Sequence, residues 1–258
     1  MKIRVRFAKW GMMKFIGHLD MMRYFQKAMR RAEIDICYST GYSPHQIMSF
    51  AQPLGVGVES CGEYFDMETE TLLPKEEALN RLNAVMAEGV WVMDYGKIAE
   101  DAPNSMSAVA MAEYEIGIRN KAPLPNEFDE LEAFIKNFLE EHQEIIVVKK
   151  TKKGEKELDI RPHLYLVEVL KEPGGTFSFP FSYQEEEAEQ TGNTRLHLKL
   201  AAGSAVNIKP NLVLEALCKA AGETYNFTDY AIKRLDLYGK EGPEEAPVYP
   251  SLGNMIET

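Results

Sequence analysis

Residues 2–9 read KIRVRFAK and residues 18–33 read HLDMMRYFQKAMRRAE. In the first stretch Ile3, Val5 and Phe7 alternate with basic residues, which predicts a β-strand with one buried face. In the second stretch apolar residues recur at helical spacing, namely Met21, Met22, Phe25, Ala28, Met29 and Ala32. We therefore expect a strand followed by a helix whose apolar side packs on the sheet.

The next 65 or so residues continue this unit. Residues 34–38 and 64–70 alternate as strands, and Gly41 and Pro44 mark a turn after the first of them. Pro74 stands where a first helical residue is favoured, and residues 90–98 read as a closing strand. The predicted order is β-α-β-β-α-β, the split βαβ or ferredoxin-like arrangement.

A short polar stretch at residues 101–107, containing Pro103, reads as a linker, and the element order after it is similar. The expected strands and helices of this half lie at residues 114–118, 128–138, 144–149, 164–170, 196–200, 210–218 and 231–238, with an acidic loop at 185–189. The sequence thus predicts an α+β protein of two tandem ferredoxin-like (βαββαβ) domains with antiparallel sheets. The first domain spans 1–104 and the second, with an irregular tail, spans 105–258.

The composition favours a folded protein without membrane-spanning segments. The chain has 258 residues, of which 45% are hydrophobic and 27% charged. No apolar run reaches the roughly 18 residues that a membrane span needs, and the N-terminus has no apolar core of a secretory signal. Cys37, Cys61 and Cys218 are isolated from one another. They predict reduced thiols in the cytoplasm, without a zinc or iron–sulfur site in this chain.

The net charge of −11 hides an asymmetry, because residues 1–50 carry nine basic and three acidic residues while the remainder carries 20 and 37. Four of the basic residues share the polar side of the expected helix: Arg23, Lys27, Arg30 and Arg31. This surface could contact phosphates, together with Lys14. The alternative is a solvated helix face without a partner.

Among five histidines, His18 and His45 attract attention, because each stands at a predicted turn of the first half. An imidazole there could bind phosphate or move a proton, or it could simply hydrogen-bond a turn carbonyl. His18, Tyr42 and His45 could meet at one edge of the domain, where Tyr42 could stack on a base. The remaining histidines read as surface or packing residues, and no phosphate-loop, GxSxG or HExxH motif occurs.

Several stretches together resemble a known family. They are residues 14–32, residues 38–45 (YSTGYSPH), residues 48–54 (MSFAQPL), residues 57–64 (GVESCGEY) and residues 203–210 (GSAVNIKP). In these stretches the chain resembles the radical-SAM-linked family of uncharacterised proteins, whose members are fused to, or encoded beside, a radical SAM protein. Relatives often read Phe-Asn-Pro-His where this chain has Tyr42-Ser43-Pro44-His45. The first half is also distantly similar to CRISPR-type RNA-processing proteins, which use tandem ferredoxin-like domains.

The resemblance implies a partner more than a reaction. We expect an accessory protein that presents an RNA substrate to a radical SAM protein, and that partner would hold S-adenosylmethionine and a [4Fe–4S] cluster. The expected RNA contacts are Lys14, Arg23, Lys27, Arg30, Arg31, Tyr42 and His45. One alternative is a metal-independent RNA-processing or RNA-modifying enzyme that uses His18 or His45. Another is a protein–protein adaptor without RNA contact.

Overall fold

A computed structural model describes residues 1–151, 154–172, 194–243 and 245–256. The protein is α+β, as predicted. Its strands form one eight-stranded mixed sheet, in the order β4-β1-β3-β10-β5-β9-β8 with β2 paired to β3, and a separate hairpin of β6 and β7. The expectation of two separate antiparallel sheets is therefore corrected. No helix in these described ranges is long and apolar enough to cross a membrane.

The chain divides into two compact units, one of residues 1–111 and 236–258 and the other of residues 112–235. One sheet results because β10 (Tyr230–Tyr238) carries residues of both units. The predicted boundary after residue 104 and the tandem ferredoxin-like division remain predictions. Each unit is described below by itself.

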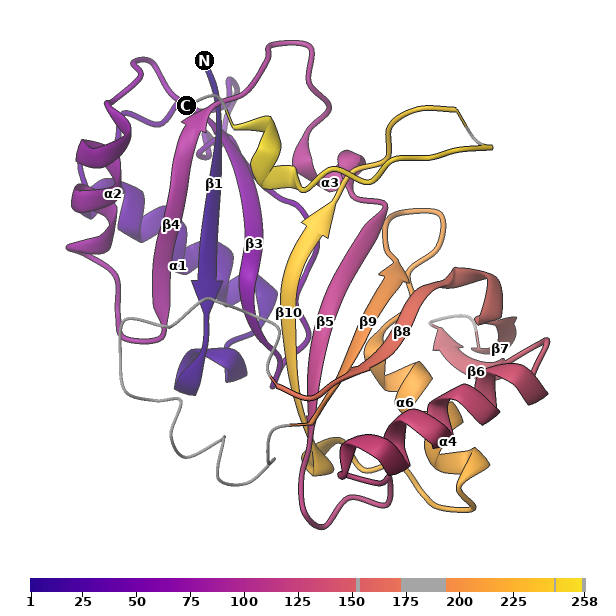
Figure 1. The fold of residues 1–258 in the computed structure, drawn as a ribbon. Coiled ribbons are helices and arrows are strands. Elements are labelled where there is room, and N and C mark those ends of the chain that lie inside the picture. Colours follow the sequence, from indigo (N-terminus) through magenta and orange to yellow (C-terminus); the bar gives the residue numbers. More distant parts are fainter. Residues whose placement is uncertain (152–153, 173–193, 244, 257–258) are drawn as a thin grey trace. The chain divides into compact units, whose positions relative to one another are not determined.

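The first unit has the element order expected for residues 2–98. Its main elements are β1 (Lys2–Lys9), α1 (His18–Arg31), β2 (Met48–Phe50), β3 (Glu59–Glu68), α2 (Lys75–Asn83) and β4 (Val90–Lys97), and the turn η1 (Gly11–Phe15) follows β1 (Figure 1). β1 pairs antiparallel with both β3 and β4, and β2 pairs antiparallel with β3. The strand expected at residues 34–38 is reduced to isolated bridges, Ile36 with Thr69 and Tyr38 with Gln46.

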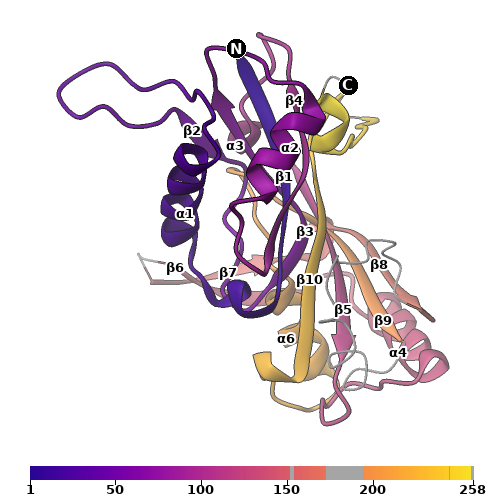
Figure 2. The ribbon, with the colours of Figure 1, turned by 90° about the vertical axis from the view of Figure 1, so that its left-hand side faces the viewer.

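The apolar side of this sheet is the one that the alternation of residues 2–9 predicted. Ile3, Val5 and Phe7 are buried against α1, where Phe25 lies 4.7 Å from Phe7 between ring centroids. Figures 1 and 2 show α1 and α2 on this face and the C-terminal turn η4 (Leu252–Met255) on the other. The amphipathic pattern of α1 thus directs it to the sheet.

The opposite face of β1 is buried as well, which the alternation did not indicate. Arg4 is fully buried, and its guanidinium makes two hydrogen bonds to the carboxylate of Asp66, its cross-strand partner on β3, at 2.8 and 3.1 Å. The other guanidinium nitrogen donates to the Leu252 carbonyl of η4 at 3.4 Å. Asp66 also accepts from the amide of Ser105 at 2.6 Å, where the short helix α3 (Ser105–Ala108) begins.

The C-terminal tail is held to this unit by a second buried carboxylate. The Tyr64 hydroxyl donates to Asp236 Oδ1 at 2.5 Å, and Ser251 Oγ donates to Oδ2 at 2.7 Å. Burial raises the pKa of Tyr64, and the charge of Asp236 raises it further. The tail from residue 239, expected to be irregular, therefore completes the core of the first unit rather than extending the second.

The second unit contains β5 (Met111–Ile118), α4 (Phe128–Glu141), β8 (Leu164–Leu170), β9 (Arg195–Ala201), α6 (Pro210–Ala220) and most of β10, with short turns η2 (Arg161–His163) and η3 (Phe227–Asp229). Residues 144–149 were expected to be a sheet strand. They instead contribute to β6 (Ile146–Thr151), which pairs with β7 (Gly154–Asp159) in the separate hairpin. Ile146 and Val148 are about half exposed, so one side of β6 faces solvent. The acidic residues 185–189 lie outside the described residues.

His197 on β9 is a buried side chain that contacts two carboxylates. The sequence had suggested only a surface or packing residue. Its Nε2 lies 2.6 Å from Glu113 Oε1 and its Nδ1 lies 2.8 Å from Glu168 Oε1. Lys199 lies 3.5 Å from the same oxygen of Glu113. Hydrogen bonding to Glu113 is the main cause that raises the pKa of His197, while burial opposes it. Two acceptors on one ring favour the doubly protonated imidazolium.

Removing Asp66 should destabilise the protein severely, because Arg4 would stay buried without a counter-charge. We expect Asp66→Ala to lower the free energy of unfolding by about 3–5 kcal/mol, measured by urea denaturation. The matched control is Asp20→Ala, which removes the exposed pair with Arg23 and should cost at most about 0.5 kcal/mol. Equal losses in the two variants would contradict a structural role for the buried pair.

The His197 cluster predicts a pH dependence of stability. A histidine whose pKa is raised by folding contributes stability that is complete below its unfolded pKa of about 6.5 and is lost as pH rises through the folded value. The free energy of unfolding should therefore fall more between about pH 6 and 9 in the wild type than in His197→Gln. His163→Gln serves as the control and should behave like the wild type. Parallel pH profiles for wild type and His197→Gln would refute this.

Candidate nucleic-acid interface

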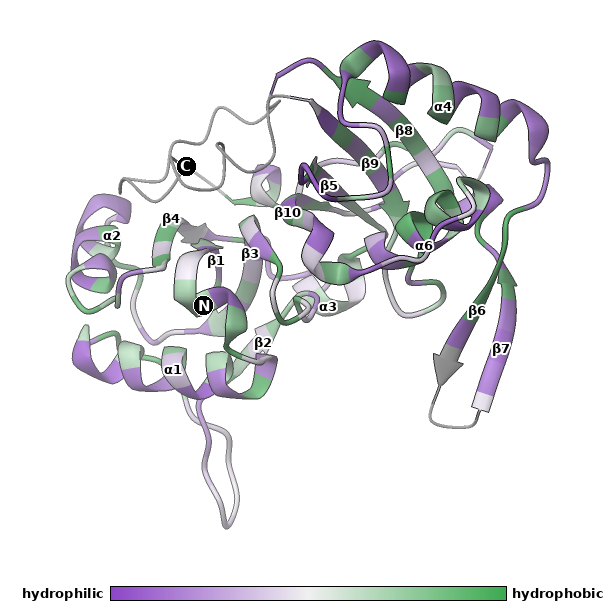
Figure 3. Cartoon of the chain, turned by 90° about the horizontal axis from the view of Figure 1, so that it is seen from below, coloured by the Kyte–Doolittle hydropathy of each residue, from purple (hydrophilic) through white to green (hydrophobic). Residues whose placement is uncertain are grey.

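The basic residues predicted on α1 lie on its solvent side. Met21, Phe25, Ala28 and Met29 are buried against the sheet, whereas Arg23, Lys27, Arg30 and Arg31 are exposed. Figure 3 shows hydrophilic and hydrophobic residues alternating along α1 accordingly. Asp20 in the first turn and Arg30 and Arg31 in the last turn also match the helix dipole. We call Tyr24, Lys27, Arg30 and Arg31 the α1 surface.

A hollow of about 440 Å³ is lined by the residues of the α1 surface. The Tyr24 hydroxyl accepts a hydrogen bond from the Ala87 amide at 2.6 Å and donates to the Met86 sulfur at 3.5 Å. Arg31 donates to the Val85 carbonyl at 2.9 Å. The aromatic ring and one guanidinium are therefore held in place by the segment that follows α2.

The two remaining cations of the hollow are open to a ligand. Lys27 and Arg30 make no ion pair within the described ranges of the chain. Arg23, one turn earlier, pairs with Asp20 at 3.1 Å, but both side chains are about 70% exposed. Such an exposed pair contributes little and can exchange its partner for a phosphate. The hollow thus offers an aromatic ring and several cations, the groups that bind bases and phosphates.

Lys14 is not among the residues that line the hollow, and its predicted contact with RNA stays a prediction. It belongs to η1, is buried, and lies 3.1 Å from the carboxylate of Glu59. The same Glu59 oxygen accepts from the Gly11 amide at 3.2 Å. The ammonium group is therefore a counter-charge inside the unit, since a buried lysine needs a partner. Lys14 stands in the largely apolar stretch of residues 10–17, and nothing in that stretch indicates that Glu59 lies beside it.

Tyr42 and His45 lie in the segment between α1 and β2, which Figure 2 shows drawn out beside α1. His45 Nδ1 is 2.8 Å from the Ser39 hydroxyl, and the Ser39 amide donates to the His45 carbonyl at 2.8 Å. These bonds close the predicted turn, in which Gly41 adopts a φ of 122°. Tyr42 at the tip is fully exposed. The segment touches α1 through Gln46, whose amide donates to the Gln26 carbonyl at 3.2 Å.

His18 occupies a different environment at the first position of α1. Its ring lies edge-on to Phe50, with centroids 5.6 Å apart. It lines a cavity of about 20 Å³ that is also lined by Phe7, Lys9, Met21, Phe50, Gln52, Leu54 and Glu63. Burial is the main cause that lowers the pKa of His18, with Glu63 raising it and Lys9 lowering it. A neutral imidazole that shares a cavity with an amine and a carboxylate can act as a general base.

The three residues expected to meet at one edge have different surroundings. Across the described ranges, none of the contacts of His18 involves Tyr42 or His45. The geometry therefore supports two locations, one at the start of α1 and one in the loop before β2, rather than one shared site.

Sequence reasoning missed Tyr24, Lys9 and Glu63. Tyr24 is three residues before Lys27 and seven before Arg31, a spacing that places all three on one side of a helix. This signal was available in the sequence. Lys9 and Glu63 come from strands with alternating polar residues, and nothing in either strand alone indicates that they flank His18.

The comparison with known families assigns the chain to a family for which no activity is given. Residues 2–210 match the family described as uncharacterised protein conserved in bacteria, DUF2344. The chain belongs to this family. No curated protein matches the sequence. Membership in DUF2344 agrees with the resemblance to an uncharacterised family, and it leaves the association with a radical SAM protein as a proposal.

Proposed function

We propose that this protein binds RNA through the α1 surface and presents it to a radical SAM protein, which performs the chemistry. The observation that carries the proposal is the hollow over α1, where a fixed tyrosine ring lies among Lys27, Arg30 and Arg31. Cations bind the phosphate backbone, and an aromatic ring stacks on a base regardless of its identity. Tyr42, exposed at the tip of the neighbouring loop, offers a second stacking platform.

An accessory role fits the chemistry of the three cysteines. Cys61 and Cys218 are buried, and Cys37 is partly buried. Burial is the main cause that raises the pKa of Cys37 and of Cys218, which disfavours the thiolate that an iron–sulfur cluster requires. In this proposal the partner holds the [4Fe–4S] cluster and S-adenosylmethionine, and both proteins work in the cytoplasm.

The proposal also includes two related ferredoxin-like halves. The strand orders β4-β1-β3-β2 and β10-β5-β9-β8 support it, because in each half the last strand lies beside the first, followed by the third and the second.

A second candidate function is a metal-independent RNA-processing or RNA-modifying enzyme. The observation in its favour is His18, whose neutral ring shares a small cavity with Lys9 and Glu63. His45 is the weaker candidate, since its ring is engaged by Ser39 in an exposed turn. A protein–protein adaptor without RNA contact is the third reading, in which the cations of α1 are a solvated face.

Substitution of the α1 cations should abolish most RNA binding. We expect Arg23→Ala, Lys27→Ala, Arg30→Ala and Arg31→Ala combined to reduce the slope of log K against log salt by about three for single-stranded RNA. Filter binding on total cellular RNA between about 50 and 200 mM salt measures both affinity and slope. Tyr24→Leu alone should weaken binding by about 1–3 kcal/mol with the slope unchanged, because it removes stacking and no charge.

The matched control removes four exposed lysines of the second unit, by Lys121→Ala, Lys136→Ala, Lys156→Ala and Lys219→Ala. It changes the net charge by the same amount as the α1 variant. If the two variants lose affinity equally, binding is a general charge effect and the α1 surface is not the site. If neither variant changes binding, the adaptor reading gains support.

The division of labour is tested by reconstitution with the proposed radical SAM partner. The purified chain alone should bind no iron–sulfur cluster and cleave no S-adenosylmethionine. Adding it to the partner should lower the RNA concentration that gives half-maximal modification, while cleavage of S-adenosylmethionine by the partner continues. The α1 variant should fail to produce this shift, and His18→Gln should produce it fully.

Two outcomes would contradict this proposal. Equal RNA modification with and without the chain would remove the accessory role. Turnover of RNA by the isolated chain that is lost in His18→Gln would establish the enzyme instead.

A further inference from the structure

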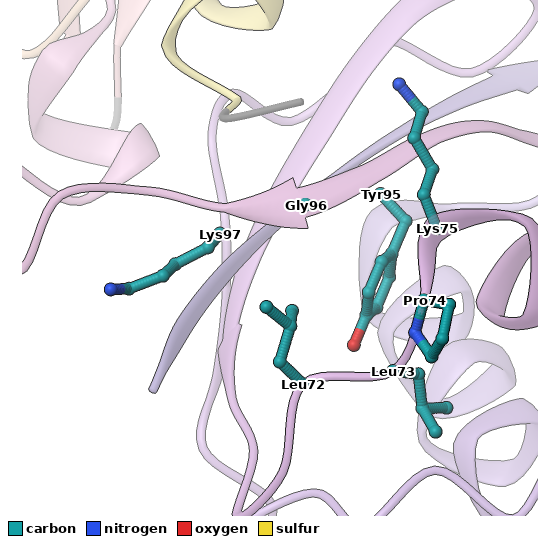
Figure 4. Close-up of a pocket in the computed structure, with 7 residues that line it drawn as sticks. All are labelled: Leu72, Leu73, Pro74, Lys75, Tyr95, Gly96 and Lys97. Atoms are coloured by element: carbon teal, nitrogen blue, oxygen red, sulfur yellow. The ribbon is translucent and has the colours of Figure 1, made fainter.

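A second hollow, unrelated to the α1 surface, lies where the segment before α2 meets the end of β4. It has a volume of about 390 Å³ and is lined by Leu72, Leu73, Pro74, Lys75, Tyr95, Gly96 and Lys97 (Figure 4). β4 is the outermost strand of the sheet on this side, so the hollow opens at a sheet edge. Its volume is within the usual range for sites of small organic ligands.

The floor of the hollow contains a buried hydroxyl whose proton is not donated. Tyr95 is 1% exposed, and its hydroxyl donates no hydrogen bond within the ranges that the structure describes, although the Leu73 amide approaches its oxygen and opposes the rise in its pKa. Figure 4 shows this hydroxyl directed between the side chains of Leu72 and Pro74. An unsatisfied buried hydroxyl costs free energy, about 1–3 kcal/mol, and a ligand that accepts its proton would recover it. Burial raises the pKa of Tyr95, so the group remains a donor at neutral pH.

The wall above the hydroxyl is the N-terminus of α2. Pro74 is the N-cap residue, and no side chain caps the first turn of this nine-residue helix. The usual Ser, Thr, Asp or Asn cap is replaced by a residue whose side chain cannot accept a hydrogen bond. Free amides at a helix N-terminus, together with the helix dipole, favour a bound anion. Pro74 and Lys75 at this terminus line the hollow, and Tyr95 lines it from β4, so two separate elements border it.

The charges around the hollow favour a ligand with a single negative charge. Lys75 is paired with Asp94 at 2.7 Å, and Lys97 makes no ion pair in the described part of the chain. Glu76 and Glu77 occupy the first turn of α2, although Glu77 is paired with Arg81 at 2.5 Å. One unpaired lysine and two nearby glutamates suit a carboxylate better than a phosphate dianion. The exposed side chain of Leu72 adds an apolar wall.

We infer that this hollow binds a small organic carboxylate with an apolar body. The carboxylate accepts hydrogen bonds from the amides at the start of α2 and from the Tyr95 hydroxyl, and Lys97 supplies the counter-charge. The apolar body packs on Leu72 and Pro74. This site is independent of the RNA proposal, because no residue of the α1 surface lines it.

The test uses phenylacetate as the probe on the full chain, measured by titration calorimetry, with benzyl alcohol and inorganic phosphate as competitors. We expect saturable one-to-one binding of phenylacetate. Tyr95→Phe should weaken it about tenfold, the loss of one hydrogen bond to a charged group, and Lys97→Met by a smaller factor. Lys136→Met, an exposed lysine of α4, is the control and should bind like the wild type.

A second measurement separates binding from folding. Tyr95→Phe removes a buried hydroxyl whose proton is not donated, so its urea midpoint should be close to or above that of the wild type. Weaker binding by a variant of undiminished stability supports the site. Absence of saturable binding to the wild type, unchanged affinity in Tyr95→Phe, or equal displacement by benzyl alcohol or inorganic phosphate would each overturn it.

Discussion

The first unit depends on a buried charge pair, the guanidinium of Arg4 against the carboxylate of Asp66 on the neighbouring strand. A fully buried guanidinium requires acceptors for its donors, and two strands alone supply only one carboxylate. The remaining acceptors are the Pro103 and Leu252 carbonyls and the Met255 sulfur. The segment after β4 and the chain terminus must therefore return to this face. The pair thus joins four stretches of chain that are far apart in sequence, namely β1, β3, the segment after β4 and the C-terminal turn.

The same pair explains what the sequence could and could not predict. The alternation in residues 2–9 correctly identified β1 and its apolar side, and the 3.6-residue period correctly identified α1 with its two faces. Alternation reads every second residue as solvent-facing, so Arg4 was expected on the surface although it is fully buried. The contacts on that face come from the tail and from the start of α3, which carry no periodic pattern. The ion pairs of Lys14 and His197 could not be predicted for a related reason, since their partners come from other strands or segments.

The sequence predicted the basic residues of the candidate interface, but it did not predict the hollow over α1. The helical spacing predicted that the four cations of α1 lie on one side of the helix, and they are exposed in the structure. The hollow exists because Tyr24 is anchored by the Ala87 amide and Arg31 by the Val85 carbonyl, contacts with the segment after α2. No local pattern encodes these contacts. A local basic surface on a chain of net charge −11 also restricts where a polyanion can bind, because the remaining surface repels it.

The two leading functions use opposite ends of one helix. His18 is the first residue of α1, while Arg30 and Arg31 form its last turn. At a rise of about 1.5 Å per residue, the imidazole and the last cations are roughly 20 Å apart along the axis. RNA held at the α1 surface would reach His18 only if it followed the whole helix past Lys27 and Arg23. Binding and any chemistry at His18 are therefore separable by substitution. A chain that only presents RNA tolerates the loss of His18, and an enzyme needs both ends of α1.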